Sequence, residues 1–161
     1  SLSPVEAIER ARRLDDEGLT WIAEPTRADD YAGHAHVARE ARTPIQAGEN
    51  WWGPHDMQKA IDARASDYMM PDVMKIGGVT GWMRAAALAH AKGVRVSSHL
   101  WPEISAQLLC VTPTAHWLEY ADWWNPVMKE PLVIEHGMTN VAGALGSGVE
   151  WNEAAVQKFS V

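Results

Sequence analysis

The sequence is short of cysteine, of basic residues and of long apolar runs. A single cysteine among 161 residues excludes an intramolecular disulfide and favours a reducing, cytoplasmic location. Cys110 falls within an apolar helical run, so we expect a buried and unreactive thiol. The 21 acidic residues outnumber the 14 basic ones and no basic stripe occurs, which argues against a nucleic-acid partner. No apolar run approaches the roughly 20 residues of a membrane span, and no signal-peptide pattern is present, so we expect no membrane partner.

What the sequence does contain is a regular alternation of helix and strand signals. Ser3-Pro4-Val5-Glu6 is typical of a capping box with proline at the first helical position, and Thr80 is the expected N-cap of a later helix. The predicted helices cover residues 4–17, 30–41, 53–65, 81–92 and 102–111, and the predicted strands cover 19–23, 44–47, 68–70, 94–98 and 117–119. Strands separated by single helices indicate right-handed crossovers and a parallel α/β sheet. The pattern fails beyond Tyr120.

A carboxylate or an imidazole stands at or just after the end of each predicted strand. These residues are Glu24, Glu49, Asp72, His99 and Glu119, spaced 20 to 27 positions apart. The carboxyl ends of successive parallel strands converge on one place, which is where barrel enzymes carry their catalytic groups. The spacing therefore predicts one shared polar site.

The first two carboxylates allow two interpretations. On adjacent parallel strands, Glu24 and Glu49 would lie about 5 Å apart at the backbone. Without a cation between them, one would have a raised pKa, and a hard ion such as Mg²⁺ removes that repulsion. The alternative is a pair of solvated loop carboxylates or helix caps, and spacing alone leaves both open.

The later strand ends are equally open from the residues alone. Asp72 beside His99 would fix the histidine tautomer and prepare a general base, or form a structural hydrogen bond at the rim of a barrel. Lys75 is either a second charged group in the site or a surface lysine. Glu119 is either an acid that donates a hydrogen bond to substrate or an ion-pair partner.

Several longer motifs resemble a known family. They are Trp21–Pro25, Gly48–Trp51, Met70–Trp82, Ser97–Leu100 and Thr112–Glu119. Together they are similar to the mandelate racemase and muconate lactonizing enzyme family of the enolase superfamily, and within it to mandelate racemase-like members. The resemblance implies the C-terminal part of a modified TIM barrel, (β/α)7β, preceded by a capping domain. It divides the chain into a second half of a barrel at residues 1–120 and a tail at 121–161 that packs on the barrel or on the capping domain.

The resemblance also implies roles for individual residues. Glu24 and Glu49 match two of three acidic Mg²⁺ ligands, and His99, held by Asp72, matches a general base. Glu119 matches the acid that hydrogen-bonds the developing enolate. Lys75, the sixth candidate site residue, matches a basic residue at the edge of the site. The shared reaction is abstraction of the proton α to a carboxylate of a small-molecule substrate, a step that needs Mg²⁺ and a strong hydrogen-bond donor because the proton is so weakly acidic.

Two family features are absent from these 161 residues, namely the first metal ligand and the Lys-x-Lys motif that carries a second base. We therefore expect weak Mg²⁺ binding and little activity from this chain alone, with the N-terminal half of the same protein and further copies as partners. The function expected for the whole protein is racemisation of an α-hydroxy acid. The alternatives are an acid-sugar dehydratase and, in a different class, a non-catalytic half-barrel.

Overall fold

The computed structural model describes residues 2–143 and 145–159 as an α/β structure built on a parallel sheet. The sheet has four strands in the order β1-β2-β3-β4, so each strand lies beside the next one in sequence. The strands are β1 (Ile22–Ala23), β2 (Ile45–Ala47), β3 (Tyr68–Met69) and β4 (Arg95–Val96). All three pairings are parallel, which confirms the predicted sheet.

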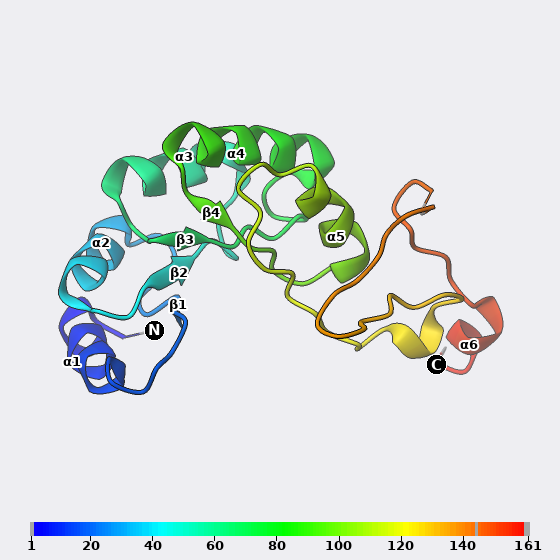
Figure 1. Ribbon diagram of the computed structural model, residues 1–161, viewed down its shortest axis with the longest axis horizontal. Coiled ribbons are helices and arrows are strands. Elements are labelled where there is room, and N and C mark those ends of the chain that lie inside the picture. Colours follow the sequence, from blue (N-terminus) through cyan, green and yellow to red (C-terminus); the bar gives the residue numbers. More distant parts are fainter. Residues whose placement is uncertain (1, 144, 160–161) are drawn as a thin grey trace.

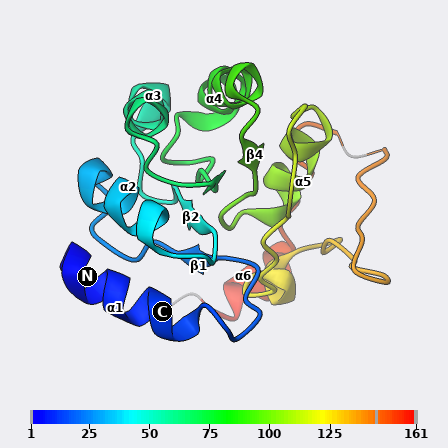
Figure 2. The same cartoon turned by 60° about the vertical axis from the view of Figure 1, so that its left-hand side comes forward.

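A helix follows or precedes each strand, as the alternation predicted. The helices are α1 (Pro4–Leu14), α2 (Tyr31–Glu40), α3 (Gly53–Ala63), α4 (Gly78–Lys92) and α5 (Pro102–Cys110). They form an arc outside the strands, with α3 and α4 side by side (Figures 1 and 2). Among the described helices, none combines the length and the apolar character that crossing a membrane requires.

Local sequence explains where most helices begin, with one exception. The capping box at Ser3 is present, because its side chain accepts from the backbone N–H of Glu6 and the Glu6 carboxylate accepts from the backbone of Ser3. The prediction that Thr80 caps α4 is wrong. The helix already begins at Gly78, with Gly77 as its N-cap at a φ of 104°. Glycine reaches this left-handed conformation easily, so the turn starts the helix without a side-chain cap.

The core lies between the sheet and the helices in two clusters. In the larger cluster, large side chains from α3, α4 and the loops pack against the helix-facing side of the strands; its least exposed members include Trp51, Met57, Met69, Ile76 and Trp82. The smaller cluster joins α1 and α2 to β2, and consists of Ala7, Ile8, Ala11, Val37 and Ile45. Both clusters hold the helix side of the sheet and leave the strand ends free to carry polar groups.

The last predicted strand differs from the expectation. Residues Trp117–Glu119 do not form a strand, and the parallel pairing with β4 is a single bridge between Val96 and Ala115. Two further hydrogen bonds still tie the segment to β4, from His116 N to Val96 O at 2.8 Å and from Ser98 N to Trp117 O at 2.9 Å. The segment therefore runs alongside β4 and brings Glu119 to the same edge of the sheet.

Residues beyond 120 leave the sheet. They contain a 3-10 turn, η1 (Asn125–Val127), and a short helix, α6 (Glu153–Gln157), joined by an antiparallel bridge between Met128 and Trp151. Trp124 stacks on Trp101 with ring centroids 5.1 Å apart, so this tail contacts the region of α5. The two-part division of the chain stays a prediction.

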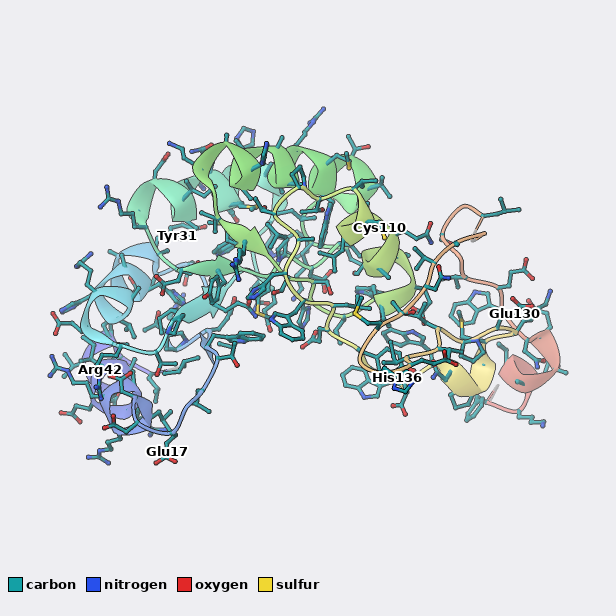
Figure 3. All side chains as sticks on the ribbon, viewed as in Figure 1. Glu17, Tyr31, Arg42, Cys110, Glu130 and His136 are labelled. Atoms are coloured by element: carbon teal, nitrogen blue, oxygen red, sulfur yellow. The ribbon has the colours of Figure 1, made fainter. Side chains whose placement is uncertain are left out.

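Cys110 corrects another expectation. It closes α5 (Figure 3) and is exposed, whereas the apolar run around it predicted burial. The buried face of α5 is supplied by Pro102, Ser105, Ala106 and Leu108. The thiol is exposed because Cys110 stands in the last turn, where α5 ends.

Candidate active site

The six predicted site residues lie in one connected network at the carboxyl ends of the strands. Direct contacts join Asp72, His99, Glu49 and Glu119, and the side chain of Asn50 joins Glu49 to Glu24 and Lys75. Each of the four strands is followed by at least one of these residues, and Glu119 comes from the segment beside β4.

His99 lies at the centre of this network. Its Nδ1 is 2.9 Å from Asp72 Oδ2, while its Nε2 is 3.4 Å from Glu49 Oε2 and 3.9 Å from Glu119 Oε2. The side chains of His99 and Asp72 are 15% and 5% exposed. Because a carboxylate can only accept here, Asp72 favours the tautomer with the proton on Nδ1. The second nitrogen is left facing two other carboxylates.

Asp72 is itself held by the loop that follows β3. Its Oδ1 accepts from the backbone N–H of Met74 at 2.7 Å and of Lys75 at 3.3 Å. Its backbone forms a parallel bridge with His99, and the N–H of His99 donates to Pro71 O at 3.3 Å. One oxygen of Asp72 therefore orders its own loop and the other orients the imidazole.

Glu24 and Glu49 converge on one amide group. Asn50 Nδ2 donates to Glu24 Oε2 and to Glu49 Oε1, both at 3.1 Å. The other oxygen of Glu24 accepts from the backbone N–H of Gly48 at 2.9 Å. Lys75 Nζ donates to Asn50 Oδ1 at 2.8 Å, so the amide links the lysine to both carboxylates.

Two unusual backbone conformations bring these carboxylates together. Glu24 has a φ of 41°, in the left-handed region that few non-glycine residues adopt. Gly48 has a φ of 141°, and a Cβ added there would lie 3.0 Å from the backbone nitrogen of Met70. Only glycine lets the chain pass this close, so Gly48 permits the turn that presents Glu49 and Asn50.

Glu119 reaches the site from the segment beside β4. Its Oε2 accepts from the backbone N–H of Leu100 at 2.7 Å, and its own N–H donates to Ser98 Oγ at 3.0 Å. Its side chain is 43% exposed, more than the other groups around His99. A hollow of about 520 Å³ opens here, lined by His99, Leu100, Glu119, Tyr120, Ala121, Asp122 and Trp123.

The carboxylates of Glu24 and Glu49 fit a hard cation in part. Glu24 and Glu49 offer carboxylate oxygens, which Mg²⁺ prefers, and their approach to one point concentrates negative charge there. Over residues 2–143 and 145–159, no group of three His, Cys, Asp or Glu side chains is placed to hold a metal ion. The pair therefore fits two ligands of a magnesium site and does not complete one.

Sequence reasoning missed two members of the site. These are Asn50, which bonds Glu24, Glu49 and Lys75, and Ser98, which accepts from the N–H of Glu119. The available signal was position, because Asn50 belongs to the Gly48–Trp51 motif and Ser98 precedes His99. Their roles depend on side-chain directions, which spacing along the chain does not define.

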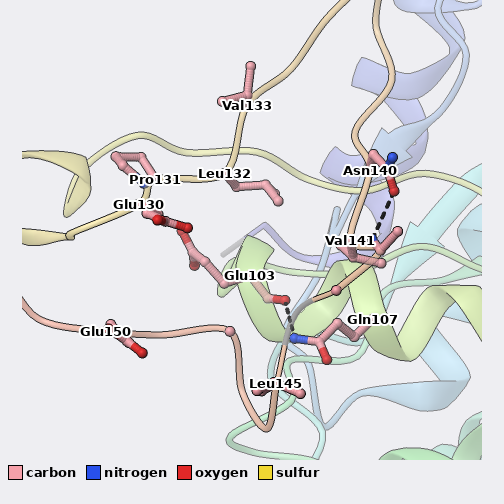
Figure 4. Close-up of a pocket in the computed structure, with 13 residues that line it drawn as sticks. Glu103, Gln107, Glu130, Pro131, Leu132, Val133, Asn140, Val141, Leu145 and Glu150 are labelled. Carbon is pink, nitrogen blue, oxygen red and sulfur yellow. Dashed lines mark hydrogen bonds between the residues drawn. The ribbon is translucent and has the colours of Figure 1, made fainter.

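Another hollow, of about 470 Å³, lies between α5 and the tail (Figure 4). None of the six predicted site residues lines it. Glu103 extends from α5 toward Glu130 in this view, and its Oε1 is buried with no hydrogen-bond partner among the described residues. This oxygen has almost no accessible surface, so a molecule in the hollow does not reach it.

The fold and the network define part of a parallel α/β barrel whose carboxylate, imidazole and ammonium groups gather at the carboxyl ends of the strands. Known proteins then identify the family. The chain belongs to the family described as enolase C-terminal domain-like, whose sequence model matches residues 1–155. This confirms the resemblance, the fold class and a family of enzymes.

Three relatives illustrate the similarity. A solved structure of an enolase from Bradyrhizobium, complexed with magnesium and mandelic acid, is 50% identical with a TM-score of 0.93, over 98% of this chain and 44% of that one. A racemase from Streptomyces coelicolor A3(2) with bound magnesium is 31% identical with a TM-score of 0.93, over 99% of this chain and 44% of that one. The L-talarate/galactarate dehydratase of Salmonella typhimurium is 32% identical over 92% of this chain.

The chain spans 37% of the length of that dehydratase. It spans 40% of a 3,6-anhydro-alpha-L-galactonate cycloisomerase from Streptomyces coelicolor, to which it is 33% identical. These relatives are therefore more than twice as long as this sequence of 161 residues.

Proposed function

We propose that this chain supplies the acid–base half of a Mg²⁺-dependent enzyme that removes the proton α to a carboxylate. The observation that carries the proposal is the contact of 2.9 Å between His99 Nδ1 and Asp72 Oδ2, with His99 Nε2 turned toward Glu49 and Glu119. A histidine held through one nitrogen presents the other to a substrate proton, which is the arrangement of a general base.

Asp72 does two things for this base. It fixes the imidazole orientation through Oδ2, and its negative charge stabilises the imidazolium that forms when His99 takes a proton. The side chain of Asp72 is 5% exposed, so its charge acts on the imidazole with little screening by water. His99 holds the abstracted proton on Nε2.

Glu24 and Glu49 are the residues that would hold Mg²⁺, with a third ligand from outside this chain. When bound, the ion neutralises part of the negative charge that builds on the substrate carboxylate as the α-proton leaves. Magnesium is present in the enolase from Bradyrhizobium and in the racemase from Streptomyces coelicolor, which supports the assignment. The network around Asn50 supports it as well, because it brings the two carboxylates to one point before any ion arrives.

Glu119 and Lys75 complete the set on this side of the site. Glu119 lies 3.9 Å from the same His99 nitrogen and is the group proposed to donate a hydrogen bond to the developing enolate, when it carries a proton. Lys75, held by Asn50, is proposed to supply positive charge at the edge of the site. An anionic substrate needs such a cation because the chain carries a net charge of −7.

The overall reaction proposed is racemisation of an α-hydroxy acid. It is supported by two relatives: the enolase from Bradyrhizobium, which is 50% identical and was solved with mandelic acid, and the racemase from Streptomyces coelicolor, which is 31% identical. Dehydration of an acid sugar is the second candidate, supported by the L-talarate/galactarate dehydratase at 32% identity. Both begin with the same proton abstraction, so His99 and Asp72 serve either one.

The test uses the whole protein with Mg²⁺ in D₂O, supplied in turn with mandelate and with galactarate. Exchange of the α-proton for deuterium without a keto-acid product supports racemisation. Formation of a keto acid supports dehydration. Absence of both exchange and product, with Mg²⁺ bound and the protein folded, contradicts the proposed proton abstraction.

A further inference from the structure

A buried polar bridge crosses the inside of the sheet below the candidate site. Ser97 Oγ donates to Gln46 Oε1 at 3.1 Å, and Gln46 Nε2 donates to Met70 Sδ at 3.3 Å. Gln46 and Ser97 are each 2% exposed and Met70 is 5% exposed. Gln46 lies in β2 and Ser97 follows β4, so the bond between them passes over β3.

Each bridge residue stands shortly before a site residue in the sequence. From the three bridge residues, the chain continues by two or three positions to a site residue on each strand: Gln46 to Glu49, Met70 to Asp72, and Ser97 to His99. The backbone of the first strand joins at the same level, because Glu24 N donates to Gln46 O at 2.9 Å. The bridge thus connects to every strand end that carries a predicted ligand, base or base partner.

Hydrogen bonds in such a buried place are directional and costly to break. A buried partner left without a bond loses its hydration and gains nothing in return, so the bridge favours one spacing of the strand ends. An apolar pair would fill the same space without fixing a direction. Displacing a reacting group by about 1 Å lowers an enzymatic rate on the order of 100-fold, so a small change of spacing is enough to matter.

We propose that Gln46 and Ser97 are positioning residues that hold the ends of β2, β3 and β4 at the spacing that His99, Asp72 and Glu49 require. The inference rests on the proposed function of those three residues. Among the described residues, the side-chain hydrogen bonds of Gln46 and Ser97 run to each other and to Met70, and none runs to His99, Asp72 or Glu49. Both act through the strand ends that they connect.

The test compares Ser97→Ala with Thr112→Val in the whole protein with Mg²⁺. Each removes one buried hydroxyl that takes part in side-chain hydrogen bonds, but Thr112 bonds to Trp82 and Leu108 between α4 and α5, away from the site. We expect Ser97→Ala to lower kcat for α-proton exchange roughly 10- to 100-fold, with KM changed less than about threefold. The substrate is mandelate, or galactarate if the whole protein acts on that acid instead. We expect Thr112→Val to lower the thermal stability about as much as Ser97→Ala does, and to leave kcat at the wild-type value.

Gln46→Met provides a second variant of similar size that removes the same bond, and it carries the test if Ser97→Ala does not fold. The double variant is expected to lose no more than the worse single variant, because both break one bridge. Wild-type kcat in the single variants, or losses that multiply in the double variant, would overturn the inference and leave the proposed function intact. A wild-type protein without exchange overturns both.

Discussion

At the scale of single residues, His99 stands out because its two ring nitrogens have different surroundings. Nδ1 is fixed by the nearly buried Asp72, whereas Nε2 faces Glu49 and Glu119 at longer distances. A base placed on one face of a substrate removes the α-proton of one enantiomer only. Under the proposed racemisation the opposite enantiomer needs a second base, and the Lys-x-Lys motif expected to carry it does not occur in these 161 residues.

We therefore predict that His99→Asn in the whole protein abolishes α-proton exchange from one enantiomer of the substrate and largely spares the other. The expected loss on the affected enantiomer is about 10²- to 10⁴-fold, the usual contribution of a general base. Following each enantiomer of mandelate separately by NMR in D₂O measures this.

His90→Asn is the matched control, because His90 is an exposed histidine on α4 and lies outside the network. It is expected to exchange both enantiomers at the wild-type rate. Equal loss from both enantiomers in His99→Asn would contradict racemisation with two bases and favour the dehydratase.

At the scale of the elements, the C-terminal end of α1 is tied to the loop before β2 by one carboxylate. Asp15 accepts from the backbone N–H of Thr43 at 2.8 Å and of Arg42 at 3.0 Å, and its side chain is 4% exposed. The hydrogen bond from Thr43, aided by those from Arg42 and opposed by desolvation, lowers the pKa of Asp15 below its ordinary value. The charged form of Asp15 is therefore the one that stabilises the fold.

Because the folded-state pKa of Asp15 is depressed, its contribution is present above the unfolded-state pKa and is lost as pH falls through the folded-state value. We predict that Asp15→Asn lowers the free energy of unfolding by about 1.5–3 kcal/mol at pH 7, the range for hydrogen bonds to a charged group. The difference from wild type is expected to shrink below about pH 4, where the carboxylate of the unfolded chain is protonated.

Urea denaturation at pH 7 and at pH 3 measures both effects. Asp16→Asn is the control, because Asp16 is the next residue, is 83% exposed and pairs with the exposed guanidinium of Arg42. Exposed ion pairs contribute little, so its unfolding curve is expected to match wild type at both values. An Asp15→Asn difference that stays constant with pH would contradict the linkage.

The helices and strands of this chain are predictable from sequence patterns only in part. The order of helices and strands was predictable because apolar periodicity and caps such as Ser3 act locally. The start of α4 was not, because Gly77 begins the turn by its backbone conformation. The strand at Trp117–Glu119 was overestimated because strand formation depends on neighbours in space. In the site, the strand-end positions were predictable, whereas the bridging role of Asn50 depends on distances between three loops.

At the scale of the whole molecule, the sheet curls so far that its first and last segments meet. The rings of Trp21 at the start of β1 and His116 after β4 have centroids 5.8 Å apart, and Tyr68 and Trp117 pack beside them. Burial, with a smaller effect of Arg95, lowers the pKa of His116. Trp117 nevertheless stays 54% exposed, and the outer edge of β1 has no neighbouring strand among the described residues.

Parallel sheets are normally covered on both faces and paired or protected at their edges, because exposed strand edges recruit other chains. We therefore predict that the 161-residue polypeptide, produced alone, associates with further copies of itself at micromolar concentration. Light scattering on a sample whose intact mass is confirmed at 17.8 kDa measures this. Adding a separately produced N-terminal portion of the same protein should convert these assemblies into a complex that binds Mg²⁺ at least about tenfold more tightly, since the two carboxylates gain further ligands. A stable, cooperatively folded monomer that already binds Mg²⁺ as tightly would instead show that the inner face and the edges need no partner.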